Sequence, residues 1–406
     1  MTIGVGGSTM EAELARLAAA RIPAPPPIGP EELRARIAQL QAGMRAANIQ
    51  ALHLDASTST FYFTGLRLRG SERLHGVLIP AEGPPIYISP AFEEAKLRTM
   101  LVLDGEVRCW HEHQSPTALI TDTIAGLGYR SGTIAIDPAT PFFTFDGLRR
   151  SGNAYSFENA GPLIAACRMR KSANEIALIK HAMEQTLEVH KATARILHAG
   201  ITTTETADFV ARAHAALGFD GAMSFSIVLF GEPTAYPHGV PYPQTLKDGD
   251  MVLVDIGATM HGYQSDVTRS YVFGEPTARQ REVWNVEKAA TLAVFEAAKL
   301  GAPCESLDAA ARRVIEGAGF ARDYGLPGLP HRTGHGLGLD VHEEPYIVQG
   351  DMTPLAPGMC FSNEPTICIY GEFGVRLEDH IYMAEDGAHW FTPPALSVDD
   401  PFGVAG

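Results

Sequence analysis

Two aspartates, Asp255 and Asp266, are spaced so that one cation could contact both side chains. Asp255 lies in an apolar run over residues 251–256, Asp266 precedes a second run over 269–273, and a turn is expected within 260–262. If the runs pair as antiparallel strands, the aspartates lie opposite or diagonal to each other, with Cβ atoms roughly 5–8 Å apart. Two carboxylates so near each other in an apolar setting repel each other unless a cation neutralises them, so the spacing predicts a metal site.

Histidines and further carboxylates follow this pair. His331, His335 and His342 occur at intervals of four and seven in one glycine-rich segment. A single histidine is more often structural than a ligand, but a cluster of imidazoles among glycines favours binding, because glycine lets the backbone approach a ligand closely. Glu364 and Glu378 each lie in an apolar, strand-like context, and either one alone is a weak signal.

Together these segments offer one imidazole and four carboxylates, whose negative charges balance two divalent cations. The five candidate ligands are Asp255, Asp266, His335, Glu364 and Glu378. Oxygen-rich ligation of this kind suits Mn²⁺, Co²⁺ or Zn²⁺. A pair of such ions about 3.5–4 Å apart lowers the pKa of a bridging water and polarises a carbonyl, so the expected chemistry is hydrolysis.

Hydrophobic periodicity predicts the elements that position these residues. Helical patterns cover residues 172–198, 203–217 and 277–300, and the first begins at a capping box that joins Ser172 to Glu175. Helices that alternate with strand-like runs predict an α+β domain with an antiparallel sheet. Before it, short apolar runs between residues 51 and 136 alternate with helical or loop segments, which is typical of an α/β layer.

Composition excludes several classes of function. A chain of 406 residues is long enough for two domains, and its net charge of −15 opposes binding to nucleic acid and to anionic membrane surfaces. Five cysteines without CxxC spacing argue against a disulfide framework and favour a cytoplasmic location. Since no apolar run reaches about 18 residues, we expect no membrane partner.

The motifs resemble those of the pita-bread metallopeptidases, specifically prolidase and aminopeptidase P. The resemblance rests on VDIGA, GYQSDVTRS, HRTGHGLGLDVHEEP, NEP and GVRLED, from about Arg168 onward, and extends more weakly to residues 33–66. It implies an α+β fold in which a creatinase-like α/β N-terminal domain precedes a C-terminal pita-bread domain. We place an N-terminal extension at residues 1–30, the first domain at 31–167 and the catalytic domain at 168–406.

The resemblance also implies roles for the metal ligands. The five candidates match the family's ligand positions, with Asp266 and Glu378 expected to bridge two divalent ions, for which Mn²⁺ is the first expectation and Zn²⁺ or Co²⁺ the alternatives. Glu364 matches a carboxylate that moves a proton from the bridging water to the leaving imino nitrogen. Arg376 matches an arginine that orders the site through carboxylate contacts.

Three histidines match family positions that contact the substrate. His238 matches the histidine near the scissile bond, His342 the one that stabilises the tetrahedral intermediate, and His331 one near the proline pocket. The chain departs from the family at Cys368, where a tyrosine is usual. We expect Cys368 to be a buried filler rather than a nucleophile.

The resemblance implies hydrolysis of the Xaa-Pro bond in dipeptides by a metal-bridging hydroxide, in a homodimer that acts on small peptides with proline in the second position. Three alternatives remain: an aminopeptidase P for longer peptides, a non-peptide hydrolase or lyase on the same fold, and an inactive binding module. The lyase-like relatives carry an added aspartate two residues after the first ligand, where this chain has Gly257. The intact ligand set argues against the binding module.

Overall fold

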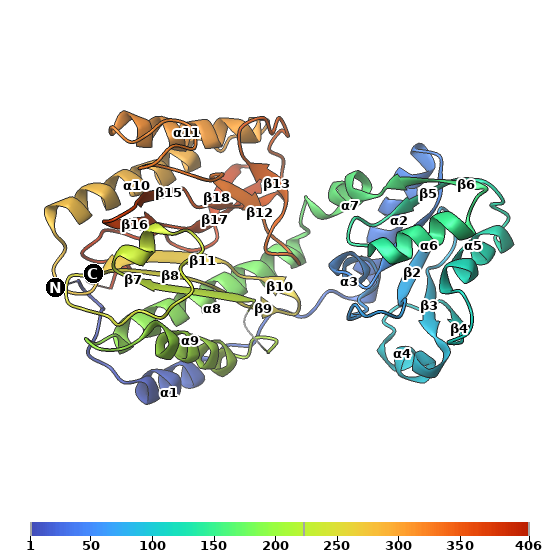
Figure 1. Cartoon of the computed structure of the whole chain (residues 1–406), viewed down its shortest axis with the longest axis horizontal. Helices are drawn as coiled ribbons and strands as arrows, with labels where there is room; N and C mark the ends of the chain where they lie inside the picture. Colours follow the sequence, from blue (N-terminus) through green and yellow to red (C-terminus); the bar gives the residue numbers. More distant parts are fainter. Residues whose placement is uncertain (1, 222–223, 405–406) are drawn as a thin grey trace. The chain divides into compact units, whose positions relative to one another are not determined.

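The computed structural model describes residues 2–221 and 224–404, and the chain divides into two compact units. One unit is Ile28–Arg168, and the other combines Met1–Pro27 with Met169–Gly406 (Figure 1). The middle unit is therefore inserted in sequence between two parts of the other. Among the described residues, none of the helices combines the length and the apolarity needed to cross a membrane.

The unit Ile28–Arg168 is an α/β layer built on a six-stranded sheet of order β4-β3-β2-β1-β5-β6. β1 runs antiparallel to β2 and parallel to β5. The strands are β1 Ile49–Asp55, β2 Gly76–Pro80, β3 Ile86–Pro90, β4 Glu106–Trp110, β5 Gly132–Ile136 and β6 Tyr155–Asn159. The helices are α2 Pro30–Ala46, α3 Thr58–Thr64, α4 Glu94–Met100, α5 Pro116–Gly126, α6 Phe142–Ser151 and α7 Gly161–Arg168, with the short η1 Ala91–Glu93.

The other unit contains two larger antiparallel sheets, of orders β11-β8-β7 and β13-β12-β14-β17-β18, and two small hairpins, β9–β10 and β15–β16. The strands of the first part are β7 Phe225–Phe230, β8 Met251–Gly257, β9 Thr259–Met260, β10 Tyr263–Gln264 and β11 Val267–Val272. The later strands are β12 Gly334–Gly336, β13 Glu343–Ile347, β14 Cys360–Asn363, β15 Thr366–Ile369, β16 Phe373–Arg376, β17 Asp379–Ala384 and β18 Gly387–Trp390.

Helices cover these strands on two sides (Figure 1). They are α1 Met10–Ala20, α8 Ala173–Ile196, α9 Thr203–Leu217, α10 Ala278–Ala297 and α11 Cys304–Gly317, with the short η2 Glu232–Ala235. One buried apolar cluster joins α10 and α11 to the strands from β14 to β17, and a second joins α1, α8 and α9 to β7 and β8. The strands that carry the candidate ligands therefore lie in a layer with helices on both sides.

The expected α+β architecture is confirmed, and so are its three long helices. Ser172 caps α8 through a reciprocal capping box with Glu175, as predicted. Capping boxes also start α9, between Thr202 and Glu205, and α10, between Thr277 and Gln280. α10 ends at Ala297 rather than at residue 300. Each box satisfies backbone N–H groups that the first helical turn leaves without a partner, which fixes where these helices begin.

Candidate metal centre and its pocket

The β8–β11 pairing places Asp255 and Asp266 close together. Asp255 is opposite Thr268 in the ladder, so Asp266 lies diagonal to Asp255, which is one of the two arrangements that the spacing predicted. Between the strands the chain reverses at His261 and Gly262, with φ values of 50° and 89°. Positive φ at both central residues is the geometry of the tightest hairpin turns, and a glycine at the second position adopts it without strain.

Glu378 joins the two aspartates from the segment between β16 and β17. It forms an isolated bridge with Thr268, whose hydroxyl donates a hydrogen bond of 2.7 Å to Glu378 Oε2. One carboxylate oxygen each of Asp255, Asp266 and Glu378 lies within 4.8 Å of the others. Three acidic groups from separate segments of the chain therefore converge on a space that one cation could fill.

His335 and Glu364 form a second group that shares Glu378. His335 Nε2 lies 2.9 Å from Glu364 Oε1 and 3.7 Å from Asp266 Oδ2. Ligand atoms of His335, Glu364 and Glu378 also lie within 4.8 Å of one another. Because His335 Nδ1 donates to the Gly336 carbonyl, the opposite nitrogen of the ring faces the carboxylates.

A glycine makes the approach of His335 possible. β12 runs between β13 and β14, and a Cβ atom on Gly334 would lie 2.0 Å from the carbonyl oxygen of Ser362. The backbone of the neighbouring His335 also donates to the Ser362 hydroxyl at 2.8 Å. Only glycine allows the two strands to pack this closely, and that packing directs the imidazole toward Glu364.

The electrostatics of the site favour bound cations. Burial raises the pKa of Asp266 and of Glu378 well above the usual range, and neighbouring carboxylates raise both further. Burial also raises the pKa of Asp255 against the opposing charge of Arg376. Asp255 Oδ1 and Glu378 Oε1 are buried without a hydrogen-bond partner among the described residues. Buried carboxylate oxygens of this kind fit divalent cations, which would supply the missing positive charge.

Glu364 differs from the other carboxylates. Burial would raise its pKa, but the charge and hydrogen bond of His335, together with His331 and Arg376, hold the pKa below its usual range. Glu364 is therefore an ionised carboxylate that faces the pocket, which is the state in which it can accept a proton.

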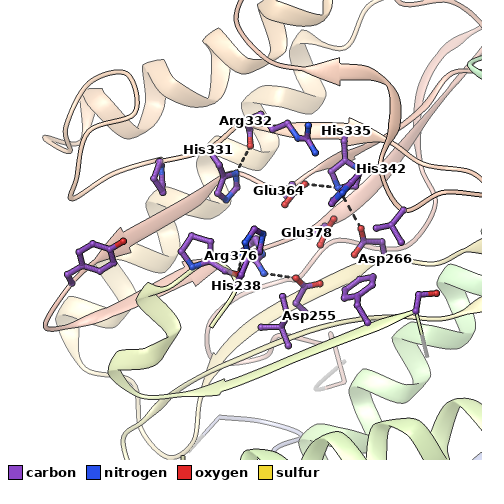
Figure 2. Close-up of a pocket in the computed structure, with 17 residues that line it drawn as sticks. His238, Asp255, Asp266, His331, Arg332, His335, His342, Glu364, Arg376 and Glu378 are labelled. Atoms are coloured by element: carbon purple, nitrogen blue, oxygen red, sulfur yellow. Dashed lines mark hydrogen bonds and ion pairs between the residues drawn. The ribbon is translucent and has the colours of Figure 1, made fainter. Parts of the chain in front are cut away.

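A cavity of about 770 Å³ opens onto these ligands, and the four residues that the sequence analysis assigned to catalysis or substrate contact besides the metal ligands line it as well (Figure 2). They are His238, His331, His342 and Arg376. Burial and the nearby charges of His335 and Arg332 lower the pKa of His342 to about 4, and burial lowers the pKa of His331. Neutral imidazoles each keep one N–H, which can donate a hydrogen bond to a substrate oxygen.

Arg376 is buried and fully engaged within the site. It donates to Asp255 Oδ2 at 2.5 Å and to the carbonyl oxygen of Pro237 at 3.1 Å. The carboxylates of Asp255, Glu364 and Glu378 raise its pKa, although burial acts in the opposite direction. The arginine thus links a candidate ligand to the segment that carries His238.

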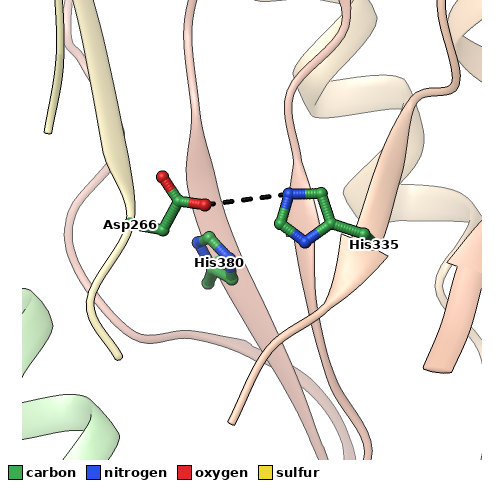
Figure 3. Close-up of side chains that lie close together, drawn as sticks. All are labelled: Asp266, His335 and His380. Atoms are coloured by element: carbon green, nitrogen blue, oxygen red, sulfur yellow. Dashed lines mark ion pairs between the residues drawn. The ribbon is translucent and has the colours of Figure 1, made fainter. Parts of the chain in front are cut away.

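His380 is a site residue that the sequence reasoning missed. It is buried, and its ring lies with Asp266 and His335, with ligand atoms of all three within 4.8 Å (Figure 3). His380 follows Glu378 by two residues at the start of β17, so the two-residue period of a strand places both side chains on one face. This two-residue period was the signal in the sequence that could have identified His380. Arg332, which also lines the cavity, was missed as well.

Cys368 lies on β15, opposite Gly374 of β16, and is buried. Burial raises the pKa of its thiol to about 12, so the side chain is a neutral thiol near neutral pH. It does not line the cavity formed by the described residues. The expectation of a buried filler agrees with this environment.

Both units of the chain match families of known proteins. Residues 177–385 match the model of metallopeptidase family M24, and residues 36–170 match the creatinase/prolidase N-terminal domain. Dipeptidase PepE from Mycobacterium ulcerans is 33% identical, with a TM-score of 0.82 over 89% of this chain and 95% of that one. A prolidase from Thermococcus sibiricus is 33% identical, with a TM-score of 0.80 over 88% and 96%.

A dipeptidase from Pyrococcus horikoshii OT3 is 32% identical to this chain, with a TM-score of 0.80 over 88% of this chain and 98% of that one. The similarity thus spans nearly the whole length of each of these solved structures, through both units. The motif-based resemblance to the pita-bread enzymes is confirmed by these matches, and the chain belongs to metallopeptidase family M24 as a metal-dependent peptidase.

Proposed function

We propose that this chain hydrolyses the peptide bond before proline in dipeptides, using two divalent cations. The observation that carries the proposal is the pair of ligand groups that share Glu378 beside a cavity lined by His238, His331 and His342. The proposed ligands are Asp255, Asp266, His335, Glu364 and Glu378. When bound, such cations supply Lewis acidity that polarises the carbonyl of a peptide bond. Mn²⁺ is the first expectation, and Zn²⁺ and Co²⁺ accept the same ligands.

Glu364 is the proposed proton carrier. Its pKa is held low by His335, so the carboxylate can accept a proton from the attacking water. The protonated carboxyl can then deliver that proton to the imino nitrogen of proline as the peptide bond breaks. A leaving amine needs this proton, because the unprotonated amide anion is a poor leaving group.

The histidines are proposed to hold the substrate. His238 and His342 line the cavity and can each donate an N–H to the carbonyl oxygen on which negative charge develops. His331 donates from Nδ1 to the carbonyl of Arg332 and lines the cavity, and we propose that it contacts the proline ring. The names of the solved relatives, two dipeptidases and one prolidase, support a dipeptide as substrate.

The test is to strip the purified protein of metal, reload it with Mn²⁺ and quantify the products from Ala-Pro, Leu-Pro and a longer Xaa-Pro-Xaa peptide. Cleavage of dipeptides alone would support the proposal, and cleavage of the longer peptide would indicate an aminopeptidase P. No cleavage despite two bound ions would favour a non-peptide hydrolase or lyase. Failure to bind ions would favour a binding module.

Two variants make the assay specific. Glu364→Gln keeps the size of the side chain but removes the proton acceptor, so turnover should fall by roughly 10²-fold or more. Glu385→Gln changes an exposed glutamate in the turn after β17 and serves as the matched control. Equal activity in the two variants would contradict the role of Glu364.

A further inference from the structure

A buried ion pair on α11 holds the segment that carries His331. Asp308 and Arg312 lie four residues apart on this helix, and both are buried. Arg312 donates to both carboxylate oxygens of Asp308, from Nε to Oδ2 at 2.8 Å and from Nη2 to Oδ1 at 3.3 Å. Neither residue lines the cavity that the described residues form. Any influence of the pair on the site must therefore act through other residues.

Arg312 binds two backbone carbonyl groups of this segment. Its Nη1 donates to the carbonyl oxygen of Leu329 at 3.1 Å, and its Nη2 donates to that of His331 at 2.7 Å. Pro330, which lies between them in the chain, and His331 both line the cavity. One guanidinium therefore fixes the backbone on both sides of Pro330, and with it the base of the His331 side chain.

Asp308 extends the same network toward the proposed metal ligands. Thr333 donates to Asp308 Oδ1 from its hydroxyl at 2.7 Å and from its backbone N–H at 3.2 Å. The Thr333 carbonyl accepts a hydrogen bond of 2.9 Å from the backbone N–H of Glu364. Thr333 also directly precedes β12, which carries His335. The ion pair is thus connected both to the backbone of His331 and to that of a proposed ligand.

The segment depends on such contacts because it has no regular structure. Residues 329–333 belong to no helix or strand, so no ladder of backbone hydrogen bonds fixes them. The guanidinium carbon of Arg332 lies 4.6 Å from the centroid of the Tyr346 ring, and Tyr346 is opposite His335 in the pairing of β12 with β13. This contact acts on the end of the segment next to β12, whereas Arg312 acts on its beginning and middle.

The guanidinium of Arg312 is suited to hold several acceptors at once. Its Nη1 also donates to the carbonyl oxygen of Asp323, and its central carbon lies 4.3 Å from the centroid of the Tyr324 ring. Lysine keeps the charge but carries a single nitrogen on a flexible stem, so it cannot reproduce the planar set of donors. Replacement of Arg312 by lysine should therefore release the backbone at His331 without changing any residue that lines the cavity.

We propose that Asp308 and Arg312 are positioning residues, which set the backbone of residues 329–333 and thereby aim His331 and Glu364 into the cavity. This inference rests on the proposed function and deepens it by naming two residues outside the cavity on which the reaction depends. It predicts that changes to this pair or to its link with Thr333 weaken the binding of substrate and of Mn²⁺.

The first test measures kcat and KM for Leu-Pro with the Mn²⁺-loaded full chain. Arg312→Lys should lower kcat/KM by about 10- to 100-fold, the range typical of residues that orient metal-site groups from outside. The loss should be mainly in KM, because Arg312 is bound to the backbone of His331. In a double-mutant cycle, Arg312→Lys should add less than about threefold to the loss caused by His331→Ala, since both remove the same contact. Arg313→Lys, at the exposed neighbouring position of α11, is the control and should match the wild type.

The second test needs no turnover. Thr333→Val keeps the shape of the side chain and leaves the ion pair intact, but it removes the hydroxyl that donates to Asp308. Isothermal titration calorimetry of the metal-free full chain should show Mn²⁺ binding about 10-fold weaker than in the wild type, the lower end of the same range. Thr204→Val, at an exposed threonine of α9, is the control and should bind Mn²⁺ as the wild type does.

The outcomes distinguish the two proposals. Failure of the loaded wild type to cleave Leu-Pro would overturn the proposed function, and the Mn²⁺ titration would then decide the inference alone. Unchanged Mn²⁺ affinity in Thr333→Val would overturn the inference. An unchanged KM in Arg312→Lys, or losses that simply add in the cycle with His331→Ala, would also overturn it. If circular dichroism shows that Arg312→Lys does not fold, the Mn²⁺ affinity of Thr333→Val decides. Weaker Mn²⁺ binding together with non-additive losses would support the inference.

Discussion

Arg376 donates a hydrogen bond of 2.5 Å to Asp255, and both side chains are buried. The same guanidinium donates to Thr268 Oγ1 and to the carbonyl oxygen of Pro237, the residue before His238. Thr268 in turn donates to Glu378. One arginine therefore orders two proposed cation ligands and the segment of a proposed catalytic histidine.

The loss of stability caused by removing Arg376 should depend on whether cations are bound. In the cation-free protein, Arg376→Gln leaves Asp255 buried without its positive partner, a change that typically costs about 3–5 kcal/mol. A divalent cation restores positive charge beside Asp255, so the cost should be smaller when Mn²⁺ is bound. Urea denaturation with Mn²⁺ and with a chelator measures both values.

Arg279→Gln is the control for this comparison, because Arg279 is an exposed arginine paired with Glu282 and Glu372. Its effect should be below about 1 kcal/mol in both states, as for other surface ion pairs. An equal loss of stability for Arg376→Gln with and without Mn²⁺ would argue against cation binding at Asp255.

Removal of divalent cations should abolish peptidase activity and make stability depend on pH. Burial raises the pKa of Asp266 and Glu378 in the cation-free site. A carboxyl group whose folded pKa exceeds its unfolded value of about 4 stabilises the fold below that value and loses this contribution as pH rises through the folded pKa. The melting temperature of the cation-free protein should therefore fall with rising pH, and Mn²⁺ should restore it.

Asp266→Asn tests whether buried carboxylates cause the pH dependence of stability in the cation-free protein. Without cations it removes one buried charge, so its melting temperature at pH 8 should exceed that of the cation-free wild type, although it should bind less Mn²⁺. Differential scanning fluorimetry from pH 5 to 8 measures the melting temperatures, and metal analysis measures the bound Mn²⁺. A variant less stable than the cation-free wild type at every pH would contradict this account.

Local signals explain which parts of the fold could be predicted. The capping box of Ser172 and Glu175 and the short turn between Asp255 and Asp266 are encoded within a few residues. Each restricts the backbone directly, so the start of α8 and the diagonal aspartate pair followed from spacing. Family motifs then predicted which distant carboxylates would join them.

Contacts between distant segments could not be predicted in this way. The position of Arg332 depends on the pairing of β12 with β13, and β12 has three residues, too few for a two-residue period to be recognised. His380 reaches the site because β17 lies beside β14. Such neighbour relations arise from the order of strands in the sheet, which the hydrophobic pattern of one strand does not specify.

Cys368→Ala should leave peptidase activity within about threefold of the wild type. Burial raises the pKa of Cys368 to about 12, and the thiolate rather than the thiol is the nucleophile, so the residue should take no covalent part in hydrolysis. The kcat/KM of Cys368→Ala for Leu-Pro can be measured together with the activity of the wild type after iodoacetamide treatment, which should not change. Cys167→Ala, a buried cysteine of the other unit, is the control. A loss beyond about 100-fold in Cys368→Ala alone would contradict the filler role.

The ion pairs of Glu13 should make the anchoring of α1 sensitive to acid. Glu13 accepts hydrogen bonds from Nε and Nη2 of Arg195 on α8, at 2.9 and 2.8 Å, and from Arg16 at 2.8 Å. Burial would raise the pKa of Glu13, but these arginines lower it to about 2. A carboxyl group with a lowered folded pKa stabilises the fold above its unfolded pKa of about 4.3 and loses this contribution as pH falls toward the folded value.

Glu13→Gln should therefore reduce the free energy of unfolding by about 1–3 kcal/mol at pH 7, the range for hydrogen bonds to charged groups. The difference from the wild type should shrink between about pH 4.5 and pH 2, because protonation removes the same charge from the wild type. Urea denaturation at pH 7, 5, 4 and 3 measures this difference, with Glu11→Gln, an exposed glutamate of the same helix, as control. A difference that stayed constant down to pH 3 would mean that packing of α1 on α8 and α9, rather than the charge of Glu13, determines its contribution.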